Sequence, residues 1–345
     1  MQDRQTLARW GEPRDYSLGL AVTMAPRQID EGIRQGRLLC RELEGARKIT
    51  RVSDGKWFLQ TRPFYSAMLG AACGDVAGSV YEFHNIKHRL APEELIRSDA
   101  YFTDDTVMTF AVAKGLRMGL ELLPEDWMSV PAAGQILSAT VEETMLVFGH
   151  RYPNAGYGGN FHRWLSSAEP RPYNSFGNGS AMRASYAGWA ARTMEEAECL
   201  AEISARVTHN HPEGVKGAVA VAGSIFLLRC GASKEEIRVY GERFYDLGFT
   251  LDEIRPDYRF DVTCQGSVPH AIVAFLEGED FADVLSRAVS IGGDSDTIAA
   301  IAGSLAEVIY PIPPEIREEV LLRLDRPMVE ELEKCVDFFF RRLQT

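Results

Sequence analysis

The sequence predicts an all-α domain that follows a small N-terminal extension of different composition. From Phe64 onward, helix-length segments rich in Ala, Gly and Leu succeed one another, and no alternation of strands with helices appears. Residues 1–60 are instead polar and carry several arginines. The 345 residues exceed the usual size of one domain, and a hydrophobic content of 46% can fill a large core. We therefore expect one large domain, residues 61–345, preceded by an arm, residues 1–60.

The predicted helices of the domain cover residues 64–82, 105–120, 132–148, 181–191, 195–206, 213–230, 269–276, 280–290, 296–310, 314–323 and 328–343. In the arm, one helix is expected near residues 27–46. A β-hairpin should follow it, because Asp54-Gly55 lies between two β-prone runs in KITRVSDGKWFLQTR.

The charge balance limits the partners of the chain. The formal net charge is −12, with 49 acidic and 37 basic residues, and no long basic run is present. Duplex nucleic acid and anionic membranes attract basic surfaces, so neither is expected as the main partner.

The cysteines and the apolar runs indicate the compartment. The six cysteines are scattered without a CxxC pair, which suits buried thiols in a reducing compartment better than a disulfide framework or a metal site. The start, MQDRQTLARWGEPRDY, lacks an apolar signal core, and the most apolar run, residues 218–228, is too short to span a bilayer. We expect a cytoplasmic location.

Two adjacent acids, Asp104 and Asp105, stand in YFTDDTVMTF, directly before an apolar helical run. This stretch alone favours helix capping, because Thr and Asp accept hydrogen bonds from the free amides of a first turn and acids suit the positive end of the helix dipole. One acid would be enough for that purpose.

A second acidic motif, IGGDSDTIAAIAG, places Asp294, Asp296 and Thr297 at another helix start. Capping two helices needs two acids, whereas the two motifs supply four. Four converging carboxylates and two threonines would repel one another unless a cation lay between them, and such hard oxygen ligands suit Mg²⁺, Mn²⁺ or Ca²⁺. The two glycines before Asp294 would let the backbone bend and bring the acids inward.

A third motif, GAACGDVAGSVYEF, repeats glycine every four residues at Gly70, Gly74 and Gly78. One helix face is therefore bare, so that another backbone can approach closely, and Glu82 follows one turn later. Alone, this motif favours a tight helix crossing with a solvated glutamate. Beside the other two motifs, it favours Glu82 as a member of the acidic site.

Two glycine-rich segments are candidate phosphate sites, although glycine more often marks ordinary turns. The loop NAGYGGN, residues 154–160, could cradle a pyrophosphate with its backbone amides, and FGNGSAMR offers Asn178, Gly179, Ser180 and Arg183. Neither is a Rossmann fingerprint.

The histidine pair in THNHP, His209 and His211, precedes Pro212, which suits the first position of the next helix. A zinc pair is a weak interpretation, because no cysteine or third histidine lies at ligand spacing. Met182 and Met194 are assigned to the core.

Five motifs in this order, GDVAGSVYE, FTDDT, GNGSAMR, THNHP and GGDSDT, resemble those of the ADP-ribosylglycohydrolases. The resemblance covers residues 64–310 and is expected to extend to the end. It implies a compact all-α fold, hydrolysis of the bond that joins ADP-ribose to a protein side chain, and two metal ions, Mg²⁺ or Mn²⁺.

The resemblance also implies roles for single residues. The metal ligands would be Glu82, Thr103, Asp104, Asp105, Asp294, Asp296 and Thr297, and all are present. ADP-ribose would be bound by Gly156, Gly158, Gly159, Asn178, Gly179, Ser180 and His209. Either Asp104 or Glu82 would accept the proton of the attacking water.

The target linkage and the arm remain open at the level of sequence. Arginine-linked ADP-ribose is the first choice, with serine linkages, DNA or small conjugates as alternatives. Some relatives are structural proteins of the eye lens, but the full ligand set argues against that role. The arm invites the hypothesis of an immunity protein that binds a cognate ADP-ribosyltransferase toxin, with possible anchors at Trp10, Arg14, Tyr16, Arg27 and Arg34. Packing on its own domain, a homodimer contact and a non-enzymatic binding protein are the alternatives.

Overall fold

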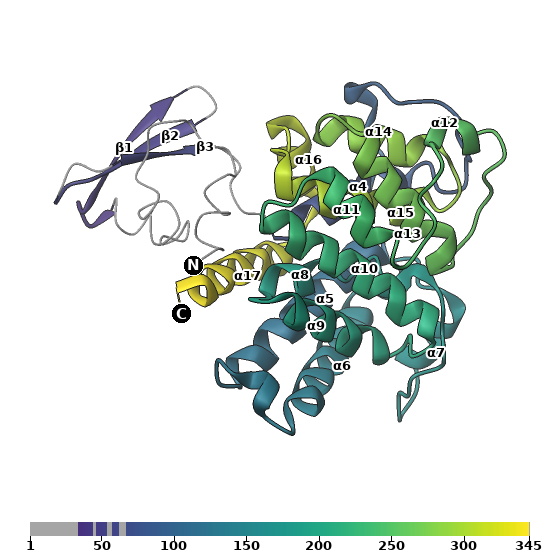
Figure 1. The fold of residues 1–345 in the computed structure, drawn as a ribbon, viewed down its shortest axis with the longest axis horizontal. Coiled ribbons are helices and arrows are strands. Elements are labelled where there is room, and N and C mark those ends of the chain that lie inside the picture. Colours follow the sequence, from purple (N-terminus) through teal and green to yellow (C-terminus); the bar gives the residue numbers. More distant parts are fainter. Residues whose placement is uncertain (1–33, 44–45, 54–56, 62–66, 345) are drawn as a thin grey trace.

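The computed structural model describes residues 34–43, 46–53, 57–61 and 67–344. From Leu69 onward the described chain is built of helices, which confirms the all-α prediction (Figure 1). The α-helices are α4 Leu69–Ser79, α5 Asp104–Glu121, α6 Ala133–Arg151, α7 Gly159–Leu165, α8 Ser185–Ala190, α9 Met194–Arg206, α10 Pro212–Arg229, α11 Lys234–Gly241, α12 Leu251–Ile254, α13 Cys264–Glu277, α14 Phe281–Ser290, α15 Ser295–Ile309, α16 Pro314–Arg323 and α17 Arg326–Gln344.

Every helix predicted in the domain has an observed counterpart, and most boundaries agree closely. Helices α7, α11 and α12 are additional. Helix α13 begins earlier than predicted, because the Thr263 hydroxyl accepts a hydrogen bond from the Gly266 amide at 3.0 Å and so caps the helix well before Pro269.

The extension contains a three-stranded antiparallel sheet of β1 Leu38–Leu43, β2 Ala46–Arg51 and β3 Trp57–Thr61. The predicted helix over residues 27–46 is therefore wrong for residues 38–43, which pair with β2 from Leu38 opposite Arg51 to Leu43 opposite Ala46. Gly36 has a φ of 71°, which ends the helical conformation just before β1. Strands β2 and β3 pair as the predicted hairpin, while its Asp54-Gly55 turn and residues 27–33 lie outside the described residues.

Helices α4 and α15 cross in contact at the centre of the domain, where both are buried along nearly their whole length (Figure 1). A side chain on Gly74 would overlap the Ala299 carbonyl, and one on Gly78 would overlap the backbone of Asp296. The prediction that the bare glycine face admits another backbone is confirmed. This crossing places the end of α4 directly beside the start of α15.

The described part of the chain has no helix that is both long enough and apolar enough to cross a bilayer. Cys73, Cys264 and Cys335 are buried free thiols, and Cys199 and Cys230 are half-buried free thiols.

Candidate active site

At the start of α5, neither Asp104 nor Asp105 caps the helix. The N-cap is Thr103, whose hydroxyl accepts a hydrogen bond from the Asp105 amide at 3.3 Å. Asp104 and Asp105 then occupy the first turn. Among the described residues, the buried Oδ1 atom of Asp105 has no hydrogen-bond partner. A buried carboxylate oxygen without a partner is costly unless a cation or another donor satisfies it.

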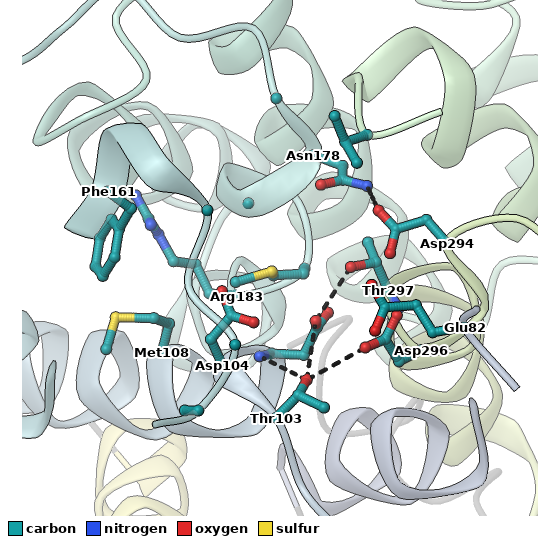
Figure 2. A pocket seen from close by; sticks show the side chains of 18 of the residues that line it. Glu82, Thr103, Asp104, Met108, Phe161, Asn178, Arg183, Asp294, Asp296 and Thr297 are labelled. Atoms are coloured by element: carbon teal, nitrogen blue, oxygen red, sulfur yellow. Dashed lines mark hydrogen bonds between the residues drawn. The ribbon is translucent and has the colours of Figure 1, made fainter. Parts of the chain in front are cut away.

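The start of α15 follows a sharp bend. Gly292 and Gly293 have φ values of 68° and 71°, which suit glycine and bring Asp294 to the N-cap position. The Asp294 side chain makes no capping hydrogen bond. Instead, its Oδ2 atom accepts a hydrogen bond of 2.6 Å from the Asn178 amide, as Figure 2 shows.

The acids of the three motifs meet at one place. Oxygen atoms of Glu82, Asp294 and Asp296 lie within 4.8 Å of one another, and Asp105 forms a second such group with Asp296 and Asp75. Thr297 donates to Asp105 Oδ2 at 3.1 Å, and Figure 2 shows Thr297 and Glu82 directed toward the same space as Asp296. The structure therefore gathers the carboxylates that the sequence places more than 180 residues apart.

The electrostatics of this cluster favour protonation in the absence of a cation. Burial, followed by the charge of Asp296, raises the pKa of Asp104 and Asp105 well above the ordinary range. Burial and the same neighbour raise the pKa of Glu82 to about 8. Burial raises the pKa of Asp294 to about 6 despite the hydrogen bond from Asn178. A divalent cation would reverse this pattern by favouring the ionised carboxylates.

The donor set fits a hard divalent cation. Its members are oxygens of carboxylates and threonine hydroxyls, which suit Mg²⁺, Mn²⁺ or Ca²⁺, and the partnerless Asp105 oxygen supplies an open ligand position. All seven predicted ligands line one cavity: Glu82, Thr103, Asp104, Asp105, Asp294, Asp296 and Thr297.

The cavity has a volume of about 590 Å³, within the usual range for small-molecule sites. The predicted glycine loop forms one wall of it. The Ala155 carbonyl accepts a hydrogen bond from the Asp104 amide at 2.7 Å, which ties this loop to the start of α5. Gly156 has a φ of 99°, and a Cβ atom on Gly158 would meet nothing within 4 Å. The loop can therefore present bare backbone to a ligand.

A second wall carries Gly177, Gly179 and His209. His209 Nδ1 lies 2.7 Å from the Thr208 hydroxyl, which itself accepts a hydrogen bond of 2.7 Å from Arg183. Because Thr208 accepts from Arg183, its own proton is available to His209 Nδ1. This arrangement favours the His209 tautomer with hydrogen on Nε2, which faces Gly179. Burial, reinforced by Arg183, lowers the pKa of His209 well below the ordinary range. The neutral His209 ring can therefore donate a hydrogen bond from Nε2 to an anionic ligand.

Two predicted ADP-ribose residues have other partners. Ser180 is fully buried and absent from the cavity lining, and its hydroxyl donates to the Gly214 carbonyl at 2.6 Å. The Asn178 amide is directed at Asp294 and Ser267 rather than at the glycine walls. His211 accepts from the Glu213 amide at 3.1 Å and so caps α10, with Pro212 at the predicted first position.

Some cavity residues were missed by sequence reasoning. Met182 is buried in the core as predicted, but it also lines the cavity, as do Met108 and Tyr173. Asp75, in the middle of α4, is fully buried beside the acidic cluster. The signal that could have found it is a lone carboxylate within a run of Gly, Ala and Val, because a buried acid needs donors or a cation.

Fold and site together define a class of all-α proteins with an acidic cluster that could hold metal ions, and comparison with known proteins identifies the family. The model of the ADP-ribosylglycohydrolase family matches residues 59–344, so this chain belongs to that family. It is 26% identical to human ADP-ribosylhydrolase ARH3 over 72% of this chain and 85% of that protein. It is 25% identical to the ADP-ribosyl-[dinitrogen reductase] glycohydrolase of Rhodospirillum rubrum, over 79% of this chain and 93% of the relative.

A third relative is the ADP-ribosylarginine hydrolase Tri1 of Pseudomonas putida, 25% identical over 74% of this chain and 73% of that protein. Among solved structures, an ADP-ribosylglycohydrolase-related protein complex superposes with a TM-score of 0.57 at 23% identity, over 80% of this chain and 96% of the other. This likeness shows the same fold. Family membership and these relatives support a hydrolase that removes ADP-ribose.

Proposed function

We propose that the protein is a metal-dependent hydrolase that releases ADP-ribose from modified arginine side chains of proteins. The observation that carries this proposal is the meeting of the acids of α5 and α15 with Glu82 at one end of a cavity whose other walls are bare glycine backbone and His209. One end suits a cation and the other suits a pyrophosphate.

Two ions, Mg²⁺ or Mn²⁺, would be held by the seven ligands named above. When bound, they supply Lewis acidity and orient the ribose hydroxyls. The chain contributes the remaining steps. The C1–N bond of the ribosyl-guanidine breaks as a water oxygen bonds to C1 through an oxocarbenium-like state, and the electron pair leaves with the guanidine nitrogen.

A carboxylate of the chain must accept the proton of that water. Asp104 and Glu82 are the candidates, because both are half-buried and both line the cavity. A carboxylate whose pKa lies near the working pH is an effective base, and burial moves both groups in that direction. Both remain candidates.

The part of the cavity beside Phe83 and Phe260, where the modified amino acid would lie, supports an arginine linkage. Phe83 and Phe260 are 79% and 49% exposed, yet their rings stack with centroids 6.1 Å apart at the cavity mouth. Phe83 directly follows Glu82, and the neighbouring Arg259 carbonyl packs close to Gly293, so this pair belongs to the metal end. Aromatic faces attract the planar, cationic guanidinium, whereas a serine side chain offers neither charge nor plane.

The test uses three substrates in parallel. The purified chain with Mg²⁺ is incubated with proteins that carry ADP-ribose on arginine, serine or glutamate, and free ADP-ribose is measured over time. Preferential release from arginine is expected, and replacement of Phe83 and Phe260 by alanine should reduce that preference. Release from serine alone would contradict the arginine assignment but retain the hydrolase. No release from any substrate, with intact ADP-ribose binding, would favour a binding protein.

The immunity role remains a prediction from sequence. Of its proposed anchors, Arg34 is exposed, while Trp10, Arg14, Tyr16 and Arg27 lie outside the described residues. We propose that residues 1–60 engage a cognate transferase in addition to the hydrolase activity.

A further inference from the structure

Asp75 lies in the middle of α4, where every residue of the helix is buried. Its carboxylate accepts four hydrogen bonds, all from the start of α5. Oδ2 accepts from the Thr103 amide at 2.8 Å, the Thr106 amide at 3.0 Å and the Thr106 hydroxyl at 2.5 Å, and Oδ1 accepts from the Thr103 hydroxyl at 2.8 Å. Each oxygen of an ionised carboxylate has about two lone-pair sites, so Oδ2 is fully occupied, whereas Oδ1 keeps one site besides its bond from Thr103.

Asp75 is also close enough to Asp105 and Asp296 to share a cation with them, since their oxygens lie within 4.8 Å. Its Oδ2 atom is fully occupied by donors that hold the first turn of α5 in place, and its Oδ1 atom already accepts the Thr103 hydroxyl. Asp75 therefore acts on Thr103, a predicted metal ligand.

The Thr103 hydroxyl is the group through which Asp75 can act. A hydroxyl has one proton and two acceptor lone pairs. The nearest acceptor for the proton is Asp75 Oδ1 at 2.8 Å, whereas Asp105 Oδ2 and Asp296 Oδ2 lie at 3.4 Å. One lone pair accepts the Asp105 amide at 3.3 Å. The second lone pair is left for the acidic cluster.

We propose that Asp75 is a positioning residue for the metal site: by accepting the hydrogen bond of the Thr103 hydroxyl, it turns a lone pair of that oxygen toward the cation and keeps the hydrogen away from it. The inference rests on the proposed function, in which Thr103 is a metal ligand. A hydroxyl proton directed at the cluster would oppose a cation electrostatically. Residues that hydrogen-bond to metal ligands commonly change the affinity for the metal about 10–100-fold.

The experiment compares three full-length proteins: the natural sequence, Asp75→Asn and Thr106→Val. Asparagine has the size of aspartate, but its amide group replaces one acceptor by a donor. Thr106→Val is the matched control, because it removes a hydrogen bond to Asp75 and leaves both Thr103 bonds intact. Affinity for Mn²⁺ is measured by calorimetry, and thermal unfolding is recorded without metal.

We expect Asp75→Asn to weaken Mn²⁺ binding about 10–100-fold and Thr106→Val to lower the unfolding temperature with unchanged Mn²⁺ affinity. Thr103→Val should lose affinity as Asp75→Asn does, and the double variant should be no weaker than Thr103→Val, because both changes remove the same interaction. Asp75→Ser serves as the second variant if Asp75→Asn does not fold.

Additive losses in the double variant, or equal Mn²⁺ affinity in Asp75→Asn and the natural sequence, would overturn the positioning role and leave the metal site standing. Absence of Mn²⁺ binding by the natural sequence would overturn the metal site and this inference together.

Discussion

Helices α5 and α15 both begin with two acids and a threonine, but different groups hold their first turns in place. At α5 a threonine caps the helix, and the buried Asp75 of another helix fixes that threonine. At α15 the turn depends on two left-handed glycines, and Asn178 fixes Asp294 from outside.

Neither helix start relies on its acids for capping. At α5 the cap is a hydroxyl, and at α15 the N-cap acid makes no capping bond. The carboxylates therefore remain available to a cation. The start of α5 should be sensitive to side-chain changes at Thr103 and Asp75. The start of α15 should be sensitive to changes that restrict the backbone at Gly292 and Gly293.

The largest effect is expected when one acid is removed at either helix start. Asp104→Ala and Asp296→Ala should each reduce turnover at least about a hundredfold, the scale of a single transition-state contact, and weaken metal binding. Both proteins should stay folded, because each change also relieves crowding among the acids. Glu315→Ala is the control, since Glu315 is an exposed acid in the first turn of α16. Full activity of both variants in EDTA would exclude the metal mechanism.

The next effect concerns the glycine wall that is tied to α5. Gly158→Val should lower ADP-ribose affinity at least about tenfold, or ~1.4 kcal/mol, because the added bulk keeps the ligand from the backbone. The residue has a φ of −58° and open space beside it, so the fold should tolerate the change. Calorimetry measures the affinity, with Gly134→Val in α6 as a control that also has open space. The companion Gly179→Val would press on His209, 3.3 Å from the added Cβ. Unchanged affinity in both cavity variants would rule out these walls.

A third, smaller effect is a pH dependence of stability, which arises from Glu82 and thus from a residue outside both helix starts. Burial and Asp296 raise the pKa of Glu82 from 4.5 to about 8. A carboxyl with a raised folded-state pKa binds its proton more tightly in the native chain, so its stability contribution falls as pH rises between these two values. In EDTA the unfolding temperature should therefore fall over this range, and it should fall less in Glu82→Gln.

Mg²⁺ should oppose this loss at pH 8. A ligand of the native state alone stabilises it by about 2.7 kcal/mol at a hundredfold excess over Kd. Identical pH profiles for the natural sequence and Glu82→Gln, or no response to Mg²⁺ or Mn²⁺, would count against an uncompensated acidic cluster.

The smallest expected effect on hydrolysis comes from the arm. A protein that starts near Thr61 should retain its activity, since the acids and both glycine walls lie beyond that residue. The immunity hypothesis adds a separate requirement: full-length Asp104→Ala should still inhibit a cognate ADP-ribosyltransferase, and the truncated Asp104→Ala should not. If the inactive full-length protein neither binds nor inhibits the transferase, only the hydrolase proposal stands.

Much of the fold and of the acid cluster could be predicted, because the information is local. Apolar periodicity gave the helices, and a glycine every four residues gave the crossing of α4 with α15. The excess of acids over the number needed for capping indicated a cation. These signals depend on neighbours within one or two helical turns.

The remainder depended on contacts across the chain. Residues 38–43 form a strand because β2 is available to pair with them, which outweighs a helical pattern. The direction of the Ser180 side chain follows from the position of the Gly214 carbonyl, and the hydrogen bonds of Asp75 follow from the position of the first turn of α5. No local pattern states which way a short polar side chain turns.

The backbone contact between Gly78 and Asp296 also sets an order of events in folding. Chain segments 217 residues apart must dock before Glu82 can share a cation with Asp294 and Asp296, as the hydrogen bond from Ser295 to the Gly78 carbonyl illustrates. An unfolded chain is then a poor chelator, and the ion arrives last. Divalent metal should accordingly slow unfolding while leaving the refolding rate unchanged, a difference that stopped-flow fluorescence can measure.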